Sequence, residues 1–299
     1  MKSTASLSQW ECLRQNVGVW QGSFIQFSPG GEKEKETPST LTLEETEADK
    51  TMSLVLERFP EDGEKKTNRL TFTAPGPAPS IYFFADGSFS QGAAQWSSFG
   101  QFGAEFSLKV GDKRVRFVVM YEGTASYTSQ LKYVTLICET QADGSEFSRV
   151  STDAEQLLGH WQGRAEAICS TQATFTQGEG RWQLSNELSL TCHEQFKAED
   201  APFSKAVLTL QAESEQTDTL HSKSLLSFTD KNSQLDYQIM LLPKGAYCLL
   251  PREIRREKAF RLEVGWLNVE KERTRFIRYY DERGVWVGSA LVEDSLMSL

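Results

Sequence analysis

Two pairs of arginines, each spaced two residues apart, are the side chains of this sequence best suited to hold an acidic ligand. Arg114 and Arg116 form one pair, and Arg273 and Arg275 form the other. Residues two apart on a β-strand share a face, so two inward guanidiniums could clamp a carboxylate or propionate. The structural interpretation is that one arginine of each pair stacks on a barrel-closing tryptophan, while the other lies in solvent.

Glutamates accompany both arginine pairs. Glu105 and Glu263 occupy equivalent places on the preceding predicted strands. Either could form an ion pair with the arginines or, if desolvated, act as an acid or base, and a structural ion pair is the favoured interpretation. Glu139 and Glu293 close the last predicted strand of each half, and we expect them to face outward.

Aromatic residues are dense between Tyr82 and Phe102. A pocket for a flat or long-chain ligand is mostly apolar with a few polar anchors, and core packing would explain the same residues equally well. The candidate pocket residues are Tyr82, Phe84, Phe89, Trp96 and Phe102.

Other chemistries have little support. The three histidines, His160, His193 and His221, lie in separate segments, without the paired spacing that zinc prefers. The sequence has no Gly-x-Ser-x-Gly nucleophile motif and no phosphate-binding glycine loop that ends in Gly-Lys-Ser/Thr. We therefore predict no metal and no cofactor, and the sequence does not decide whether the protein is an enzyme.

Short β-branched and aromatic runs recur every 8 to 15 positions between charged or Gly/Pro turns, a pattern typical of an all-β sandwich or barrel. Short helical patterns are confined to Ser8–Asn16 and Asp153–Leu158. The strands predicted in the first half are Trp20–Phe27, Thr40–Glu44, Met52–Phe59, Arg69–Thr73, Ile81–Ala85, Gln95–Val110, Lys113–Glu122 and Leu131–Glu139.

An internal repeat determines the predicted architecture. Gly18-Val-Trp-Gln-Gly22 returns as Gly159-His-Trp-Gln-Gly163, and four later blocks, including those of Glu105 and the arginine pairs, recur in the same order. We expect two tandem antiparallel barrels, at residues 1–145 and 153–299, with the boundary between residues 140 and 152. Each barrel begins with a short helix.

These residues carry a family resemblance. A Gly-x-Trp on the first strand after a short helix, with an arginine on a late strand, resembles the lipocalin-like (calycin) pattern, in which Trp20 and Trp161 would close the barrels and an arginine would pack across each. The full set of motifs resembles an uncharacterised double-barrel family of cyanobacteria and plastids. That family is distantly similar to the lyases that attach open-chain tetrapyrroles to phycobiliproteins.

The composition of the chain limits the kinds of partner and compartment that we expect for the protein. The formal net charge of −9 argues against a nucleic-acid surface. Five cysteines without a Cys-x-x-Cys spacing favour a reducing compartment, and no apolar run is long enough to span a bilayer. We expect a cytoplasmic protein, or one of the plastid stroma if eukaryotic. The basic residues between Arg252 and Lys258 predict a solvated edge, or alternatively a docking patch for an acidic partner.

The first barrel is the better candidate for a cavity that binds a small, largely apolar ligand such as a lipid, a polyene or a tetrapyrrole. One alternative is an enzyme acting on such a ligand, as a bilin lyase, isomerase or cyclase. The other alternative is a packed scaffold that binds another protein as an assembly factor. A sizeable cavity with an arginine inside would favour ligand binding, and an exposed apolar patch would favour the scaffold.

Overall fold

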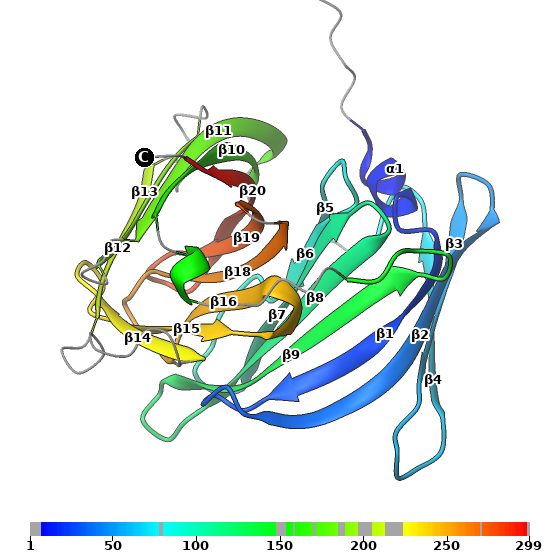
Figure 1. Cartoon of the computed structure of the whole chain (residues 1–299), viewed down its shortest axis with the longest axis horizontal. Helices are drawn as coiled ribbons and strands as arrows, with labels where there is room; N and C mark the ends of the chain where they lie inside the picture. The colour runs from blue at the N-terminus through cyan, green and yellow to red at the C-terminus, as the bar shows by residue number, and fades with distance from the viewer. Residues whose placement is uncertain are drawn as a thin grey trace, which may run out of the picture.

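The computed structural model describes residues 7–77, 80–147, 154–157, 159–169, 172–184, 189–196, 205–212, 224–269 and 271–297. For residues 155, 160, 172–184, 189–196 and 205–212 it describes the backbone alone. The described residues form two β-sheet halves with very little helix (Figure 1). The predicted all-β fold with two barrel-like halves is confirmed.

The first half opens with α1 (Gln9–Arg14), and its strands form one antiparallel sheet in the order β4-β3-β2-β1-β9-β8-β7-β6-β5. The strands are β1 (Gly18–Phe27), β2 (Lys33–Glu47), β3 (Thr51–Arg58), β4 (Lys66–Thr73), β5 (Ile81–Phe83), β6 (Phe89–Gly92), β7 (Gln101–Val110), β8 (Lys113–Gly123) and β9 (Ser129–Gln141).

The second half opens with the short 3-10 helix η1 (Ala154–Leu157) and forms a closed barrel, in which the first strand, β10, pairs with the last, β20. A second 3-10 turn, η3 (Pro243–Gly245), precedes β16. The strands are β10 (Gly159–Cys169), β11 (Gln172–Leu184), β12 (Ser189–Phe196), β13 (Lys205–Ala212), β14 (Leu225–Asp230), β15 (Asp236–Leu241), β16 (Ala246–Pro251), β17 (Glu253–Ile254), β18 (Phe260–Val269), β19 (Glu272–Tyr280) and β20 (Trp286–Leu296).

The first sheet is a curled half-barrel rather than a closed cylinder. Its two edges, β4 and β5, are not paired with each other in the described residues. β4 is exposed along nearly its whole length, and β5 has only three residues. A charged edge strand and a very short one both discourage further pairing, so the concave face stays open on one side (Figure 1).

Helix α1 covers one end of the concave sheet. Ser8 and Glu11 form a capping box at its start, which satisfies backbone N–H groups that a helix leaves unpaired. Trp10 and Leu13 of α1 pack with Trp20, Leu41 and neighbouring side chains in a buried apolar cluster. The helix predicted within Ser8–Asn16 is therefore present, and Trp20 packs beneath it.

The two halves share one core. On β8, Val115, Phe117 and Val119 point away from the concave face and are buried with Phe276 and Tyr280 of the second half in a single apolar cluster. The short strand β17 leaves the barrel and pairs with β9 of the first sheet. β17 lies within the basic segment for which the sequence predicts a solvated edge or, alternatively, a docking patch for an acidic partner. In the described residues, no helix is long and apolar enough to cross a bilayer.

Candidate functional site

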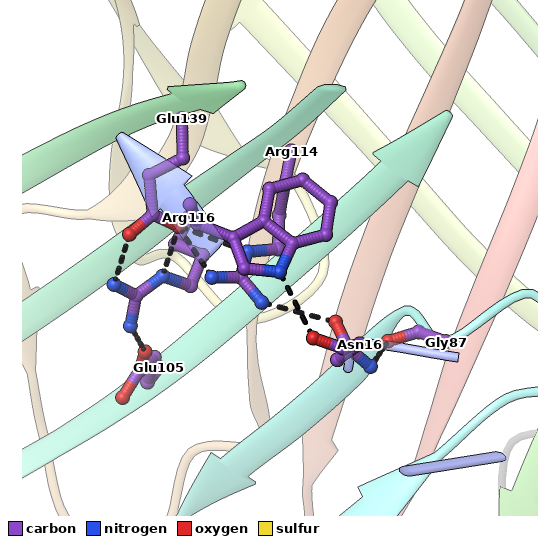
Figure 2. A network of polar contacts seen from close by, with 7 residues as sticks. Asn16, Gly87, Glu105, Arg114, Arg116 and Glu139 are labelled. Atoms are coloured by element: carbon purple, nitrogen blue, oxygen red, sulfur yellow. Dashed lines mark hydrogen bonds and ion pairs between the residues drawn. The ribbon is translucent and has the colours of Figure 1, made fainter. Parts of the chain in front are cut away.

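A buried network of four charges lies on the concave side of the first sheet, where β7, β8 and β9 run side by side (Figure 2). Glu139 is fully buried and accepts hydrogen bonds from Arg114 Nε at 2.8 Å and from Arg116 Nε and Nη2 at 3.0 and 2.8 Å. Arg116 Nη1 donates to Glu105 Oε1 at 2.7 Å. Each guanidinium is therefore already ion-paired with a carboxylate of its own sheet.

Arg114 also joins this network to the closed end of the sheet. Its guanidinium carbon lies 4.3 Å from the centre of the Trp20 ring, a cation–π distance. Arg114 Nη1 donates to Asn16 Oδ1 at 3.0 Å, and Trp20 Nε1 donates to the Asn16 carbonyl at 2.9 Å. Trp20 is thus held by two contacts: its hydrogen bond to Asn16, just after α1, and the guanidinium of Arg114 against its ring.

The second barrel repeats this arrangement. Arg273 lies 4.2 Å from the Trp161 ring centre, and Trp161 Nε1 donates to the Leu157 carbonyl at 3.2 Å. Asp294 Oδ2 accepts from Arg273 Nε at 3.0 Å and from Arg275 Nε at 2.6 Å. Arg275 Nη1 donates to Glu263 Oε1 at 2.9 Å, and Glu263 also pairs with Arg261. The duplicated chain has therefore kept its buried ion pairs as well as its strands.

The pairing corrects two expectations about these charges. Glu139 was expected to face outward, yet it is the central acceptor of the first network. Glu293 does face outward, where it pairs with Arg164, and Asp294 takes the position equivalent to Glu139. Arg116 and Arg275, expected in solvent if their neighbours stack, are both buried.

The repeated Gly-x-Trp-Gln-Gly motif serves the same networks. Gly18 and Gly159 have φ of +137° and +116°, a region that disfavours side chains. A Cβ on Gly22 would lie 2.0 Å from the Cys138 carbonyl oxygen and 2.9 Å from Cγ of Glu139, and one on Gly163 would lie 2.5 Å from Oδ1 of Asp294. The last glycine of each motif makes room for the buried carboxylate.

The arginines control the ionisation of these carboxylates. Burial alone would raise the pKa of Glu139, but Arg114 and Arg116 outweigh burial and hold that pKa below its ordinary value. The pKa of Asp294 is lowered in the same way by Arg275 and Arg273 against the effect of burial. Both carboxylates are therefore charged at neutral pH, which suits a structural ion pair better than an acid or base.

The aromatic candidates lie mostly between the halves. Tyr82 stacks on Trp286 with ring centres 4.9 Å apart, and Phe84 meets Phe276 edge-on at 5.2 Å. Phe102 contacts Tyr280 at 5.3 Å.

The other two aromatic candidates lie in different places. Trp96 contacts Phe260 of the second half at 6.3 Å. Phe89 packs on Phe83, near α1. These five rings thus build the junction and the closed end, and their assignment as ligand contacts stays a prediction.

A cavity of about 310 Å³ opens on the concave face of the first sheet, beside the buried network. Three cationic residues line it: Lys35 from β2, Arg58 from the end of β3 and Lys66 from the start of β4. No acidic residue belongs to its lining, so we call it the basic cavity.

The wall of the basic cavity is aromatic and polar. Phe24 and Tyr133 supply rings, and Gln26, Thr37 and Thr135 supply hydrogen-bonding groups. Pro60 and Val118 complete the lining. Phe24 connects the cavity to the buried network, because the guanidiniums of Arg58 and Arg116 each lie 5.7 Å from the centre of its ring.

The two halves of the chain match two different family models. Residues 6–144 match the model of the N-terminal part of a domain of unknown function, DUF3598. Residues 148–297 match the model described as the C-terminal domain of biogenesis factor required for ATP synthase 1. A DUF3598 protein of unknown function from Nostoc punctiforme, solved as a crystal structure, is 30% identical over 99% of this chain and 100% of that one, with a TM-score of 0.78. The chain belongs to the DUF3598 family.

Other comparisons add little to the family assignment. A transferrin binding protein B from Haemophilus parasuis aligns at 8% identity over 95% of this DUF3598 chain and 76% of its own, with a TM-score of 0.24. That score is too low to carry an argument. No curated protein matches the chain.

Sequence reasoning missed the cationic residues of this DUF3598 member. Lys35 and Lys66 lie between predicted strands, and Arg58 lies near the end of the predicted strand Met52–Phe59. Alternation in Lys33-Glu-Lys-Glu-Thr37 was the available signal, because it puts Lys35 and Thr37 on one face. The side chains of His160 and His193, and the whole of His221, lie outside the described residues. Among the described residues, no three His, Cys, Asp or Glu side chains gather as a metal site would require.

Proposed function

We propose that this protein is an assembly factor, a rigid double-barrel scaffold that binds a subunit of the ATP synthase before that subunit is incorporated. The choice of partner comes from the name of the family model that matches residues 148–297. The shared core supports the scaffold, since burial of aromatic rings from both halves in one cluster resists hinge motion.

The observation that carries the proposal is an exposed aromatic–arginine cluster at the junction of the halves. Phe99 and Tyr127 of the first half are 75% and 53% exposed, with ring centres 5.5 Å apart. The guanidinium carbon of Arg256, from the second half, lies 5.5 Å from the Phe99 ring centre and 5.0 Å from that of Tyr127. We call these three residues the junction patch.

The junction patch is held in place by its surroundings. Arg256 Nη2 donates to Ser98 Oγ at 3.3 Å, and Tyr127 sits in a turn at φ +58°, a conformation that is uncommon for a residue with a large side chain. Aromatic residues and arginine are enriched in protein interfaces and among their energetic hot spots. The segment from Arg252 to Lys258, which contains Arg256, has four basic and two acidic residues, and Arg255 is paired with Glu253, so a partner segment with an acidic and apolar surface would be complementary.

The experiment measures binding of each purified soluble ATP synthase subunit to the full chain and to the Phe99→Ser/Arg256→Gln variant. We expect at least one subunit to bind with a micromolar or lower Kd, and the variant to bind it about 30-fold more weakly or worse, as for the loss of a hot spot. The control is Leu70→Ser/Arg164→Gln, two positions that are also exposed and lie far along the chain from the patch. Equal loss in both variants, or no binding by the wild type, would refute the proposal.

Ligand binding in the first half is the second candidate function. The observation that favours it is the basic cavity, which has an arginine in its lining and a volume of about 310 Å³, at the lower end of the range for small-molecule sites. The chromophore lyase, isomerase and cyclase alternatives stay predictions. An absorption spectrum of the protein purified from its own host would test them.

A further inference from the structure

We infer that the basic cavity binds a small organic anion with a flat apolar body, attached to a carboxylate, sulfonate or phosphate group. This inference rests on the second candidate function and adds the chemical class of the ligand. It departs from the expectation of a largely apolar ligand, because the polar and charged side chains of the lining outnumber the apolar ones.

The charges of the cavity lining support an anionic ligand. In the described residues, Lys35, Arg58 and Lys66 form no ion pair, although acidic residues are adjacent in sequence. Those acids have other partners: Glu36 pairs with Lys33, Glu57 pairs with Lys65, and Glu34 accepts a hydrogen bond from Gln26 of the lining at 2.9 Å. Three cations that converge on one concave space without a carboxylate produce a positive potential, which an anionic group would neutralise.

Arg58 gives a second, independent indication that the cavity binds an anion. Its Nε is buried and has no hydrogen-bond acceptor among the described residues. A buried donor without an acceptor costs about 1–3 kcal/mol, so native proteins rarely leave one. An anionic oxygen in the cavity would satisfy this donor.

Strand register explains why the cavity lies where it does. Lys35 of β2 is level with Gln26 of β1, which is level with Thr135 of β9 and then Val118 of β8. The adjacent row carries Thr37, Phe24, Ile137 and Arg116 across the same four strands. The cavity therefore has its cations at the β2–β4 side and an apolar and aromatic floor toward β8 and β9.

The floor fits a flat ligand body. Phe24 presents a ring whose centre is 5.7 Å from each of two guanidinium carbons, and Tyr133 presents another ring. Aromatic rings prefer offset-stacked or edge-on contacts with other rings. A planar apolar group could lie against these rings while its acid group reaches Lys35, Arg58 or Lys66.

In the second barrel the equivalent space is filled differently. The repeat offset puts Ala165 at the place of Phe24 and Ile277 at the place of Val118. Both residues are buried in a small apolar cluster with Ala290 and Val292. The inference is therefore confined to the first half.

The test uses two dyes that differ in one group: anilinonaphthalene sulfonate and the same anilinonaphthalene without its sulfonate. Each dye is titrated into the full chain by fluorescence, at low salt and at about 0.5 M NaCl, where charges are screened over a few ångströms. We expect saturable binding of the sulfonate at one site, at least about tenfold tighter than binding of the neutral dye and weakened by salt. Competition by naphthoate and by naphthyl phosphate then identifies the preferred acid group.

The variants locate the site. Lys35→Gln/Lys66→Gln and Arg58→Gln should each weaken sulfonate binding, the double variant by about tenfold or more, and leave neutral-dye binding within about twofold. The matched control, Lys33→Gln/Lys65→Gln, removes two lysines from the same segments that are ion-paired rather than in the lining, and it should bind as the wild type does. Circular dichroism and melting curves check that each variant is folded.

Three outcomes would overturn the inference. Equal binding of both dyes with no effect of salt would leave a ligand-binding function without its anion preference. Equal weakening by the control lysines would place the dye elsewhere. Failure of both dyes to bind the wild type would remove the ligand-binding function together with the inference, and the subunit-binding proposal would be unaffected because its variants are different.

Discussion

The guanidinium carbon of Arg114 lies 4.3 Å from the centre of the Trp20 ring, and this contact joins the buried charges of the first sheet to its apolar closed end. Arg273 and Trp161 repeat the contact at 4.2 Å. Because each stacked arginine also binds a buried carboxylate, the ionic and apolar parts of each half are one packed unit.

Removal of the central carboxylate should therefore be costly. Glu139→Gln leaves Arg114 without its acidic partner and Arg116 with only Glu105. We expect a loss of about 3–5 kcal/mol in the free energy of unfolding, the range for breaking a buried ion pair. Urea unfolding measures it. The control is Glu293→Gln, which alters an exposed pair and should stay within about 0.5 kcal/mol of wild type; equal losses would contradict the assigned pairing.

The same carboxylate makes stability depend on pH. The pKa of Glu139 is lower in the folded protein than in the unfolded chain, so its contribution is fully present above the unfolded value of about 4.3 and is lost as pH falls through the folded value. The difference in unfolding free energy between wild type and Glu139→Gln should be constant from pH 7 to about 5 and shrink below about 4. A difference that grows with acidity would refute this sign.

Gly22 should tolerate no side chain. Gly22→Ala would bring a methyl group within 2.0 Å of the Cys138 carbonyl oxygen, so we expect either no folded protein or a loss of at least about 3 kcal/mol. Gly100→Ala is the matched control, because a Cβ there meets nothing within 4 Å. Expression level and thermal melting compare the two. A Gly22→Ala variant that melts like the wild type would show that β1 and β9 are farther apart.

The shared core predicts one cooperative unfolding transition for the whole chain. Phe102→Ala removes a buried ring that contacts Phe260 and Tyr280 of the second half, and should cost about 3–5 kcal/mol. Phe99→Ala, at a largely exposed ring, should cost less than about 0.5 kcal/mol. Tryptophan fluorescence and circular dichroism should report the same midpoint. Two separate transitions would mean that the halves unfold independently.

The sequence alone predicts the repeat and the strand-rich fold, because these depend on local spacing, whereas the tryptophan–arginine pairs are what the resemblance to lipocalin-like barrels implies. The sequence could not predict which carboxylate pairs with the arginines of the second barrel. In the sequence comparison of the two halves, Glu293 is the residue that matches Glu139. In the structure, Asp294 takes the position of Glu139 instead, because a shift of one residue along a strand moves a side chain to the opposite face of the sheet. Only the register between β10 and β20 resolves that choice.

The aromatic cluster shows a second limit of sequence reasoning. Alternation correctly puts Phe102, Ala104 and Phe106 on one face of β7. It does not say whether that face encloses a ligand or meets another barrel, because both environments are apolar. Likewise, Lys35, Arg58 and Lys66 are far apart in sequence and come together only because β2, β3 and β4 are neighbours in the curled sheet.

Since the outer face of β7, β8 and β9 is covered by strands of the second half, the order of synthesis matters. β9 is complete at residue 141, whereas β19 ends at residue 280. At about 5–20 residues per second, a ribosome needs roughly 7–28 s to make the intervening chain. During that interval the first copy of the repeat is a nascent domain with an aromatic surface in water. The duplication thus creates a brief folding intermediate whose exposed aromatic face favours aggregation until the second copy emerges.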